Sequence, residues 1–418
     1  MVIEHINERL TWDAIIIGGG AAGFFGAISI MEHACTPKKV LLLEKSNRLL
    51  GKVKISGGGR CNVTHNCLDP KPLIQNYPRG GKSLLGPFHH FSPQDTINWF
   101  EERGVELKTE SDGRMFPITD NSQTIIDCLM ETATNLGIEI VLKAGVSDID
   151  YQDQDSLYTL TVNDSLTIRA RSVLVATGGT RITSGAKLLT KLGHNLMPPV
   201  PSLFTFTISD PILSDLEGLS VPKALVEIIG TNYKTEGPVL ITHWGLSGPG
   251  ILKLSAFAAR FLEECNYTFQ IKINWCPDDS ITDILTQMRK DCGKRQISKR
   301  SPISSLPKRL WAKFCIAAKI SPTQTWAQLT RLQEQDLLSY LTSNILEVEG
   351  KSLNKDEFVT CGGVPLTEIT TQTMESKYSK NLYLAGEVLN IDGITGGFNF
   401  QNAWTTGFIA GRSISRKV

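Results

Sequence analysis

Residues 54–65, KISGGGRCNVTH, place an arginine, a cysteine, an asparagine and a histidine beside three consecutive glycines. Three kinds of chemistry suit these residue types: a thiolate at Cys61 favoured by Arg60, a metal site, or a backbone cradle for a phosphate group. A zinc site built from Cys61, His65 and Cys67 lacks a fourth ligand at the usual spacing. A disulfide oxidoreductase would need a closer partner than Cys67. We therefore favour the interpretation of Cys61 as a small core residue.

A glycine fingerprint upstream favours the phosphate cradle. Gly18, Gly20 and Gly23 follow a short β-branched run, which predicts a buried strand, and they open an apolar segment that predicts a helix. In such a unit the first glycine permits a tight turn, the second lets a pyrophosphate approach, and the third lets the helix pack closely. A second predicted strand ends at Glu44, at the spacing of about 20 residues where an acid binds the adenosine ribose. The pattern indicates an adenine dinucleotide; the alternative is a glycine-rich turn that only packs a helix on a sheet.

The apolar segment 14–31, AIIIGGGAAGFFGAISIM, also reaches the length of about 18 residues at which a membrane span is suspected. It contains the G-x-x-x-G motif of membrane helix pairs. Three glycines in succession would break such a helix, and no basic cluster flanks the segment. We therefore expect a strand, a turn and a helix here, and no membrane partner.

Segments far along the chain decide between FAD and NAD. The apolar run 382–385 ends on a glycine and Glu387, and a glycine pair at 396–397 then opens a helix of small residues. In flavoproteins with two dinucleotide-binding sites, such an acid binds the ribityl chain of FAD, and the helix points its N-terminus at the flavin. The run 173–179, VLVATGG, matches the return strand of the same fold. NAD dehydrogenases need no such second half-site, so these segments favour FAD.

Together with four further motifs, these segments resemble the bacterial flavoproteins of the BaiN/RdsA type, often labelled NAD(FAD)-utilising dehydrogenases. The motifs are KISGGGRCNVTH (54–65), GRMFPITDNSQTIIDCL (113–129), THWGLSGPGILKLS (242–255) and CGGVPLTEITTQTMESK (361–377). The resemblance covers nearly the whole chain. It implies an α/β fold: a Rossmann-like FAD-binding domain of the glutathione-reductase type, an inserted β-barrel-like domain and a small helical insertion.

The fingerprint and the resemblance together predict the cofactor site residue by residue. In the resembling proteins the 54–65 loop runs beside the pyrophosphate and the flavin, where Arg60 offers a planar donor fork to phosphate or flavin oxygens. The predicted FAD-binding residues are Gly18, Gly20, Ala21, Ala22, Gly23, Glu44, Lys45, Ser56, Gly57, Arg60, Cys61, Asn62, Val146, Ala176, Thr177, Gly178, Gly386, Glu387, Gly397, Phe398, Asn399 and Gln401. We expect no metal ion.

Two positions depart from the family pattern. Asn390 stands where the family usually has an acid after Glu387, and the stretch after Gly179 is shorter than the family's glycine-rich loop. Both differences concern the substrate and the activity more than FAD binding.

The middle of the chain changes character. The runs 203–210, 224–230 and 267–275 alternate apolar with polar or β-branched residues, which predicts antiparallel strands. Later stretches such as 325–332 have helical stripes. We expect the FAD-binding domain at 1–198 and 350–418, the β domain at 199–276 with a return strand near 345–350, and the helical insertion at 277–345. The insertion is a candidate lid over the flavin.

Composition and charge bound the class of protein. The chain has 418 residues, with 43 basic and 42 acidic residues and a net charge of +1. This balance argues against a nucleic-acid partner held by bulk electrostatics, and we interpret the basic run 294–300, KRQISKR, as a solvated linker. The nine cysteines are scattered, with no C-x-x-C, as in a reduced cytosolic protein. The N-terminal MVIEHINERLTWD has no secretory pattern, so we expect a cytoplasmic location.

We expect an FAD-dependent oxidoreductase that acts on a small-molecule substrate. No second G-x-G-x-x-G offers NADH or NADPH a domain of its own, so either donor would dock transiently at the flavin. The resemblance implies reduction of a conjugated carbon–carbon double bond. The alternatives are an oxidase of small amines or alcohols and, less favoured, a flavoprotein that modifies tRNA. His65, His243 and Cys61 are the candidate catalytic groups, since a histidine can transfer a proton near pH 7.

Overall fold

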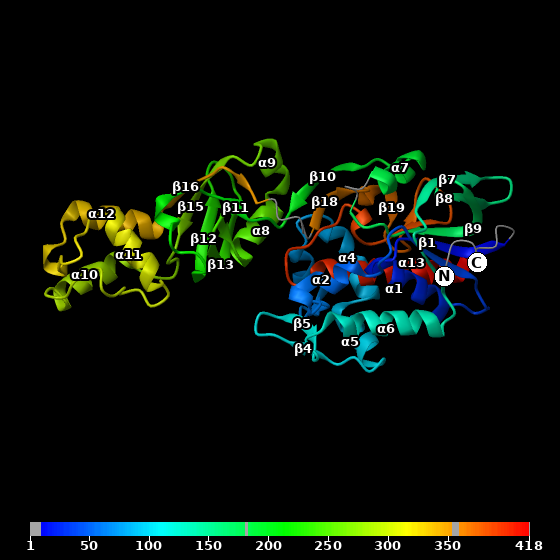
Figure 1. Cartoon of the computed structure of the whole chain (residues 1–418), viewed down its shortest axis with the longest axis horizontal. Helices are drawn as coiled ribbons and strands as arrows, with labels where there is room; N and C mark the ends of the chain where they lie inside the picture. Colours follow the sequence, from blue (N-terminus) through cyan, green and yellow to red (C-terminus); the bar gives the residue numbers. More distant parts are fainter. Residues whose placement is uncertain (1–9, 180–182, 353–358, 418) are drawn as a thin grey trace. The chain divides into compact units, whose positions relative to one another are not determined.

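The computed structural model describes residues 10–179, 183–352 and 359–417. The chain divides into two compact units: residues 1–199 with 359–418 form the first, and residues 200–358 form the second (Figure 1). Residues 1–9, which carry most of the N-terminal segment considered for a secretory signal, lie outside the described residues. The same holds for residues 180–182 of the loop after Gly179.

A nine-stranded sheet forms the core of the first unit. Its parallel strands lie in the order β21, β9, β1, β2 and β6. Their bounds are β1 Thr11–Ile17, β2 Val40–Glu44, β6 Glu139–Leu142, β9 Leu166–Val175 and β21 Leu382–Leu384. The apolar runs of β1 and β2 are almost entirely buried, as expected for parallel strands covered on both faces. Antiparallel strands extend the sheet: β7 Val146–Gln152 and β8 Leu157–Val162 beside β9, and β19 Ile369–Thr370 and β20 Glu375–Ser376 beside β21.

Two helices from opposite ends of the chain pack against each other in this unit. They are α1 (Ala21–Glu32) and α13 (Phe398–Lys417), and Figure 1 shows them side by side. Small residues permit the contact, because a Cβ added to Gly407 would lie 2.6 Å from the Ala22 carbonyl oxygen, and one added to Gly411 would lie 2.4 Å from that of Gly26. The strand, turn and helix predicted for 14–31 are confirmed.

Six further α-helices and two small sheets complete the described part of the first unit. Its other helices are α2 Gly51–Gly59, α3 Pro70–Leu73, α4 Gly81–His90, α5 Pro93–Glu101, α6 Ser122–Asn135 and α7 Thr183–Lys191. A small sheet joins β3 Thr64–His65, β5 Arg114–Pro117 and β4 Leu107–Thr109, and a two-stranded sheet joins β10 Met197–Ser202 and β18 Val359–Gly363.

The second unit is built on a seven-stranded antiparallel sheet. The strands follow the order β16, β15, β12, β13, β14, β11 and β17. Their bounds are β11 Phe206–Thr207, β12 Ser220–Ile228, β13 Lys234–Thr242, β14 Gly245–Ser247, β15 Phe269–Asn274, β16 Asn344–Val348 and β17 Gly350–Lys351. The strands predicted at 224–230 and 267–275 form as β12 and β15, whereas the run 203–210 contributes only the short β11.

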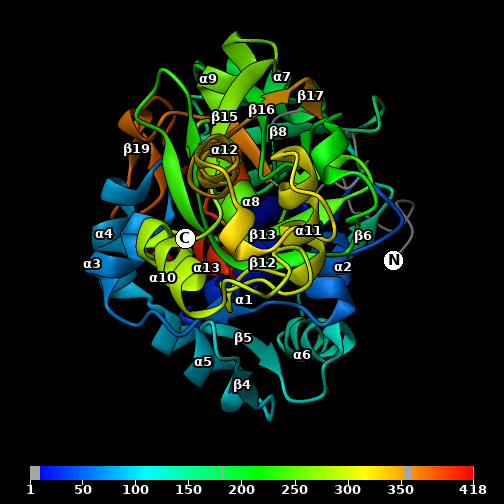
Figure 2. The same ribbon diagram turned by 90° about the vertical axis from the view of Figure 1, so that its left-hand side faces the viewer.

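The described residues of the second unit also form five α-helices: α8 Pro249–Phe257, α9 Ala259–Glu264, α10 Ile281–Asp291, α11 Lys308–Ala317 and α12 Arg331–Thr342. Figure 2 views the unit with α10, α11 and α12 toward the reader. These three helices share one hydrophobic core with the sheet, in which Trp275 of the strand side lies with Trp311 and Trp326. We therefore describe the predicted β domain and helical insertion as one unit.

The helix predicted over 325–332 is wrong in its boundaries. Residues Trp326–Gln328 form only a 3-10 turn, and α12 begins at Arg331. The cause is Thr330, whose side chain accepts a hydrogen bond from the Gln333 N–H in a capping box. A good N-cap residue thus interrupts the apolar stripe.

The glycine turn between β1 and α1 offers a matched pair of substitutions. A Cβ at Gly23 would lie 1.9 Å from the Gly18 carbonyl oxygen, whereas a Cβ at Gly20 would meet no atom within 4 Å. We expect Gly23→Ala to destabilise the FAD-free protein by about 2 kcal/mol or more, a fall of about 5 °C in Tm, because backbone must move. Gly20→Ala should stay within about 2 °C of the unaltered protein. Thermal unfolding followed by circular dichroism checks both, and equal Tm values for the two variants would contradict the packing argument.

Candidate cofactor-binding site

The carboxyl ends of four parallel strands bring the predicted segments to one edge of the sheet. Gly18 follows β1, Glu44 ends β2, Ala176 follows β9, and Gly386 lies two residues after β21. Because β21, β9, β1 and β2 are parallel neighbours, these segments lie side by side. Strand β1 lies between β9 and β2, which makes this edge the switch point at which open α/β sheets bind ligands.

The glycine turn leaves room for a ligand at the start of α1. Gly18 has φ +116°, and a Cβ there would lie 2.4 Å from the Ala176 carbonyl oxygen, so the turn packs directly on the segment after β9. Gly20 is the N-cap of α1, and no described atom lies within 4 Å of a Cβ added to it. The space beside Gly20 at the helix N-terminus fits a pyrophosphate, which helix N–H groups bind.

The carboxylate of Glu44 is held by the backbone of the same turn. Its two oxygens accept hydrogen bonds from the N–H groups of Gly19 and Ser46, each at 2.8 Å. These bonds fix the direction of the carboxylate, and each oxygen keeps a second lone pair for a ribose hydroxyl. The geometry fits the role predicted for this acid.

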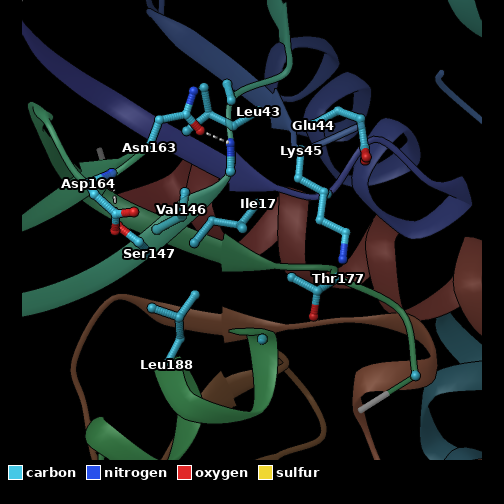
Figure 3. A pocket seen from close by; sticks show the side chains of 15 residues that line it. Ile17, Leu43, Glu44, Lys45, Val146, Ser147, Asn163, Asp164, Thr177 and Leu188 are labelled. Carbon is cyan, nitrogen blue, oxygen red and sulfur yellow. Dashed lines mark hydrogen bonds between the residues drawn. The ribbon is translucent and has the colours of Figure 1, made fainter. Parts of the chain in front are cut away.

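A cavity of about 310 Å³ lies beside Glu44 (Figure 3). Five of the predicted residues line it: Gly18, Glu44, Lys45, Val146 and Thr177. Its volume is at the lower end of the range of small-molecule sites, about 300–1,000 Å³. The cavity lies at the β1–β2 side of the sheet edge.

The opposite wall of this cavity was missed by the sequence analysis. It includes Ser147, Asn163, Asp164 and Leu188. The Asn163 side chain braces the wall, because its oxygen accepts from the Gly145 N–H at 2.9 Å and its amide donates to the Lys143 carbonyl at 2.7 Å. Asn163 stands in a turn between two strands, and no motif there signals a ligand.

Glu387, after β21, lies where this segment meets α2, β18 and the segment after β9. One carboxylate oxygen accepts from the Thr360 N–H at 2.9 Å, and the other forms an ion pair with Lys52 at the start of α2. A Cβ added to Gly178 would lie 4.0 Å from the carboxylate, so the β9 and β21 segments touch here. Lys52 was missed because its partner stands 335 residues away in the sequence.

The three glycines of the opening stretch break α2 into a tight loop. Gly57, Gly58 and Gly59 have φ values of 58°, 69° and 86°, a left-handed region that favours glycine. A Cβ at Gly57 would lie 2.8 Å from the Phe116 ring, whereas Gly58 and Gly59 face open space. The loop is closed on its inner side and open on its outer side, as a backbone cradle requires.

The guanidinium of Arg60 is engaged within the protein. The group lies over the Phe116 ring, 4.0 Å from its centre, and donates hydrogen bonds to Glu110 at 2.6 Å and Asp120 at 3.5 Å. These acids follow β4 and β5. In this structure the donor fork ties the loop to the small sheet, and a contact of Arg60 with phosphate or flavin stays a prediction.

Cys61 is fully buried in the first unit. Its N–H donates to the Ser56 carbonyl at 3.0 Å, and burial raises the pKa of its thiol to about 12. The thiol is therefore neutral at pH 7 and lacks the thiolate that nucleophilic catalysis needs. The geometry supports the core-residue interpretation.

His65 is held as a neutral ring. It stacks on Phe398 with 4.7 Å between ring centres, and its Nε2 lies 3.1 Å from the Asp112 carbonyl oxygen. Burial lowers the pKa of His65, so the ring is uncharged at pH 7. Since a carbonyl only accepts, Nε2 carries the proton, and Nδ1 keeps a lone pair with no partner among the described residues.

His243 does not share a unit with the other two catalytic candidates. It lies in the turn after β13 with 81% of its side chain exposed, and its Nδ1 is 4.0 Å from a Glu217 oxygen. His65 and Cys61 belong to the first unit, and His243 to the second.

The start of α13 fixes the opening stretch in place. With its amide in the orientation that satisfies both groups, Asn62 accepts from the Gly397 N–H at 3.0 Å and donates to the Thr64 carbonyl at 3.1 Å. The Trp404 indole donates to the Val63 carbonyl at 2.9 Å. The predicted residues Asn62 and Gly397 are therefore brought together, although 335 positions separate them.

Two further predicted residues of α13 have their amides engaged within the protein. Gln401 is buried, and its amide bonds to three threonine hydroxyls, those of Thr64, Thr96 and Thr405. Asn399 makes two hydrogen bonds of 2.9 Å with the Gly393 backbone. In this structure both side chains support the loop and helix beside the predicted site.

Asn402, which the sequence analysis did not name, offers an acceptor at the sheet edge. Its side-chain oxygen is buried without a hydrogen-bond partner among the described residues. It stands one turn before Thr406, whose hydroxyl accepts from the Gly386 N–H at 2.8 Å, so both lie on one face of α13. Open space at Gly20 and Gly58 and this orphaned oxygen together fit an extended cofactor with hydroxyl donors.

The described part of the chain contains no helix that is long and apolar enough to cross a membrane. It also contains no group of three or more His, Cys, Asp or Glu side chains placed to hold a metal ion.

Burial of Cys61 predicts its reactivity. At pH 7.5 we expect iodoacetamide to alkylate the exposed Cys35 while Cys61 reacts at least about tenfold more slowly, because its thiol is enclosed and neutral. Peptide mass spectrometry over time measures both rates, and in urea the two should become similar. Equal alkylation rates of Cys35 and Cys61 in the folded protein would make Cys61 a candidate nucleophile again.

The ion pair of Glu387 predicts its effect on cofactor retention. Glu387→Ala leaves Lys52 and the Thr360 N–H without their acceptor, and we expect the protein to retain less than about a tenth of the normal FAD after gel filtration. Glu375→Ala is the matched control, since Glu375 pairs with Lys417 at 2.7 Å. The ratio of flavin to protein absorbance gives the result. Equal loss in both variants would argue against a specific role for Glu387.

Comparison with known proteins agrees with this geometry. A family model described as "HI0933-like protein Rossmann domain" matches residues 12–413. The chain is 29% identical to the ribosomal RNA dihydrouridine synthase of Escherichia coli (strain K12) over 414 residues, 96% of this chain and 98% of the relative. It is 25% identical to the 3-dehydro-bile acid delta(4,6)-reductase of Clostridium scindens over 412 residues, with the same coverage. Among solved structures, a 3-ketosteroid-delta4-(5alpha)-dehydrogenase from Rhodococcus jostii RHA1 matches 99% of both chains with a TM-score of 0.51 and 12% identity, which shows a shared fold.

Proposed function

We propose that this chain reduces a carbon–carbon double bond conjugated to a carbonyl group. The premise is that the chain belongs to the HI0933-like family of Rossmann-type, FAD-dependent oxidoreductases. The observation that carries this proposal is the common chemistry of two relatives that align over nearly the whole chain. Dihydrouridine is uridine reduced at the ring double bond that is conjugated to a carbonyl. A delta(4,6)-reductase of a 3-dehydro bile acid is likewise named for double bonds in a 3-oxo ring system.

The electron donor we propose is NADH or NADPH. In the balanced reaction the nicotinamide loses a hydride, one proton is taken up, and the double bond gains both. When bound, FAD supplies the hydride-transfer chemistry between donor and acceptor. The sequence has a single G-x-G-x-x-G, so the nicotinamide would dock transiently at the flavin rather than in a domain of its own.

Different residues of the first unit are proposed to bind different parts of FAD. We assign the pyrophosphate to the open turn at Gly20, the adenosine ribose to Glu44, and the ribityl chain to the region of Glu387 and Asn402. Each assignment is supported by a free acceptor or by open space at that position.

His65 is proposed as a group that binds rather than protonates the substrate. A neutral ring whose Nδ1 lone pair has no described partner accepts a hydrogen bond, and it has no proton on that atom to give. Its stacking on Phe398 at the start of α13 keeps the ring in one orientation.

An anaerobic visible spectrum tests the proposed reaction. We expect flavin bands that bleach with NADH or NADPH and return when an acceptor with a conjugated enone is added, either a 3-oxo-4-ene steroid or uridine-containing RNA. Saturated analogues of the same acceptors are the control and should leave the flavin reduced. Bands that persist with both nicotinamides would contradict the reductase and lead to amine or alcohol oxidation. A colourless protein that takes up no FAD would overturn the site itself.

A further inference from the structure

The cations of the second unit are concentrated in its helical part. Residues 275–343, between β15 and β16, contain 11 lysines and arginines against 6 aspartates and glutamates, a net charge of +5. Residues 200–274 of the same unit contain 5 basic and 7 acidic residues. The net charge of +1 for the whole chain therefore conceals a strongly basic segment.

Hydrogen bonds gather six of these cations around two joined segments. The segments are 293–300, which precedes α11, and 319–333, which leads into α12. The bonds run from the Trp326 N–H to the Arg295 carbonyl at 3.1 Å, from the Ile297 N–H to the Gln324 carbonyl at 3.0 Å, from the Ser298 hydroxyl to the Pro322 carbonyl at 3.1 Å, and from the Gln333 amide to the Lys319 carbonyl at 2.8 Å. We call Lys294, Arg295, Lys299, Arg300, Lys319 and Arg331 the basic cluster.

The side chains of the basic cluster make no polar contact with the described part of the chain. All six are exposed, and none makes a hydrogen bond or an ion pair with another described residue. Other cations of the same unit are paired: Arg289 binds Glu334 at 3.0 Å, and Lys313 binds Asp215 at 3.2 Å. The donors of the six side chains are thus available to a partner.

The acids near the basic cluster are fewer than its cations. Glu334 is ion-paired with Arg289, whereas Asp291 accepts a hydrogen bond from the neutral amide of Gln287. Asp336 is the remaining acid of α12. Exposed lysine and arginine side chains are groups that bind phosphodiester oxygens.

We propose that the basic cluster binds the phosphate backbone of an RNA, whose uridine is the acceptor of the reaction. This inference rests on the proposed function, because uracil carries a ring double bond conjugated to a carbonyl. It departs from the expectation that no nucleic acid binds, which was drawn from the net charge of the whole chain. The glycine turn lies in the first unit, whereas the basic cluster lies in the helical part of the second. A small free metabolite would need no such exposed cations.

Fluorescence anisotropy with a fluorescein-labelled RNA hairpin tests the surface on the FAD-loaded full chain. The test variant carries Lys294→Gln, Arg295→Gln, Lys299→Gln and Arg300→Gln. The control variant carries Lys71→Gln, Lys82→Gln, Lys143→Gln and Lys380→Gln, which are exposed lysines of the first unit with the same total change in charge. Circular dichroism and flavin absorbance verify that both variants fold.

We expect the test variant to bind the hairpin at least about tenfold more weakly at about 0.1 M salt, with a salt dependence less steep by about 3 in log–log slope. The control variant should stay within about twofold. Equal weakening in both variants, or no binding by the unaltered protein, would overturn the surface. Tighter binding to vesicles with 20% phosphatidylserine than to the hairpin would assign the cluster to a membrane instead.

The two proposals fail in distinguishable ways. In one outcome the flavin bleaches with nicotinamide and is reoxidised by a steroid enone, but the protein does not bind RNA. This outcome would support the reductase and contradict the RNA surface. In the other outcome RNA binding depends on the basic cluster, but neither nicotinamide reduces the flavin. This outcome would support the RNA surface and contradict the proposed donor.

Discussion

The contact between α1 and α13 is the constraint on which the first unit depends. Gly407 and Gly411 let the two helices lie backbone to backbone, since any Cβ at these positions would overlap a carbonyl oxygen of α1. This contact places Thr406 where it accepts the Gly386 N–H, and so it sets the segment that carries Glu387. It also places Gly397 and Trp404 against the opening stretch, which holds the glycine loop in its conformation.

Residues that act within one supersecondary unit were predictable from the sequence. The strand, glycine turn and helix at 11–32, with Glu44 closing the next strand, follow from periodicity and from the steric freedom of glycine alone. The ends of β9 and β21 also lie at one edge of the sheet, because these neighbouring strands are parallel. These signals are local, and each has a mechanism that needs no distant partner.

Contacts between distant segments were not predictable in the same way. Lys52 finds Glu387, and Asn163 braces the cavity wall, through approaches that only the folded chain creates. Arg60 has the chemistry of a phosphate ligand, yet two acids after β4 and β5 compete for its donors. The tempting chemistry of Cys61 likewise depends on its surroundings, which exclude water and keep the thiol neutral. Side-chain type indicated what each group can do, and burial decided what it does.

The pairing of β21 with β9 has a consequence for the order in which the protein matures. Strand β9 ends at Val175, and the strand that lies beside it begins at Leu382, after the entire second unit has been made. During synthesis the sheet therefore waits with an open edge while residues 200–358 emerge, and an unpaired edge is prone to pair with other chains. Only when β21 and α13 leave the ribosome is that edge closed and the cofactor cradle completed. A chain cut short before this point would keep the exposed strand and lack Glu387 and α13, so completion of the predicted cofactor site depends on the last part of translation.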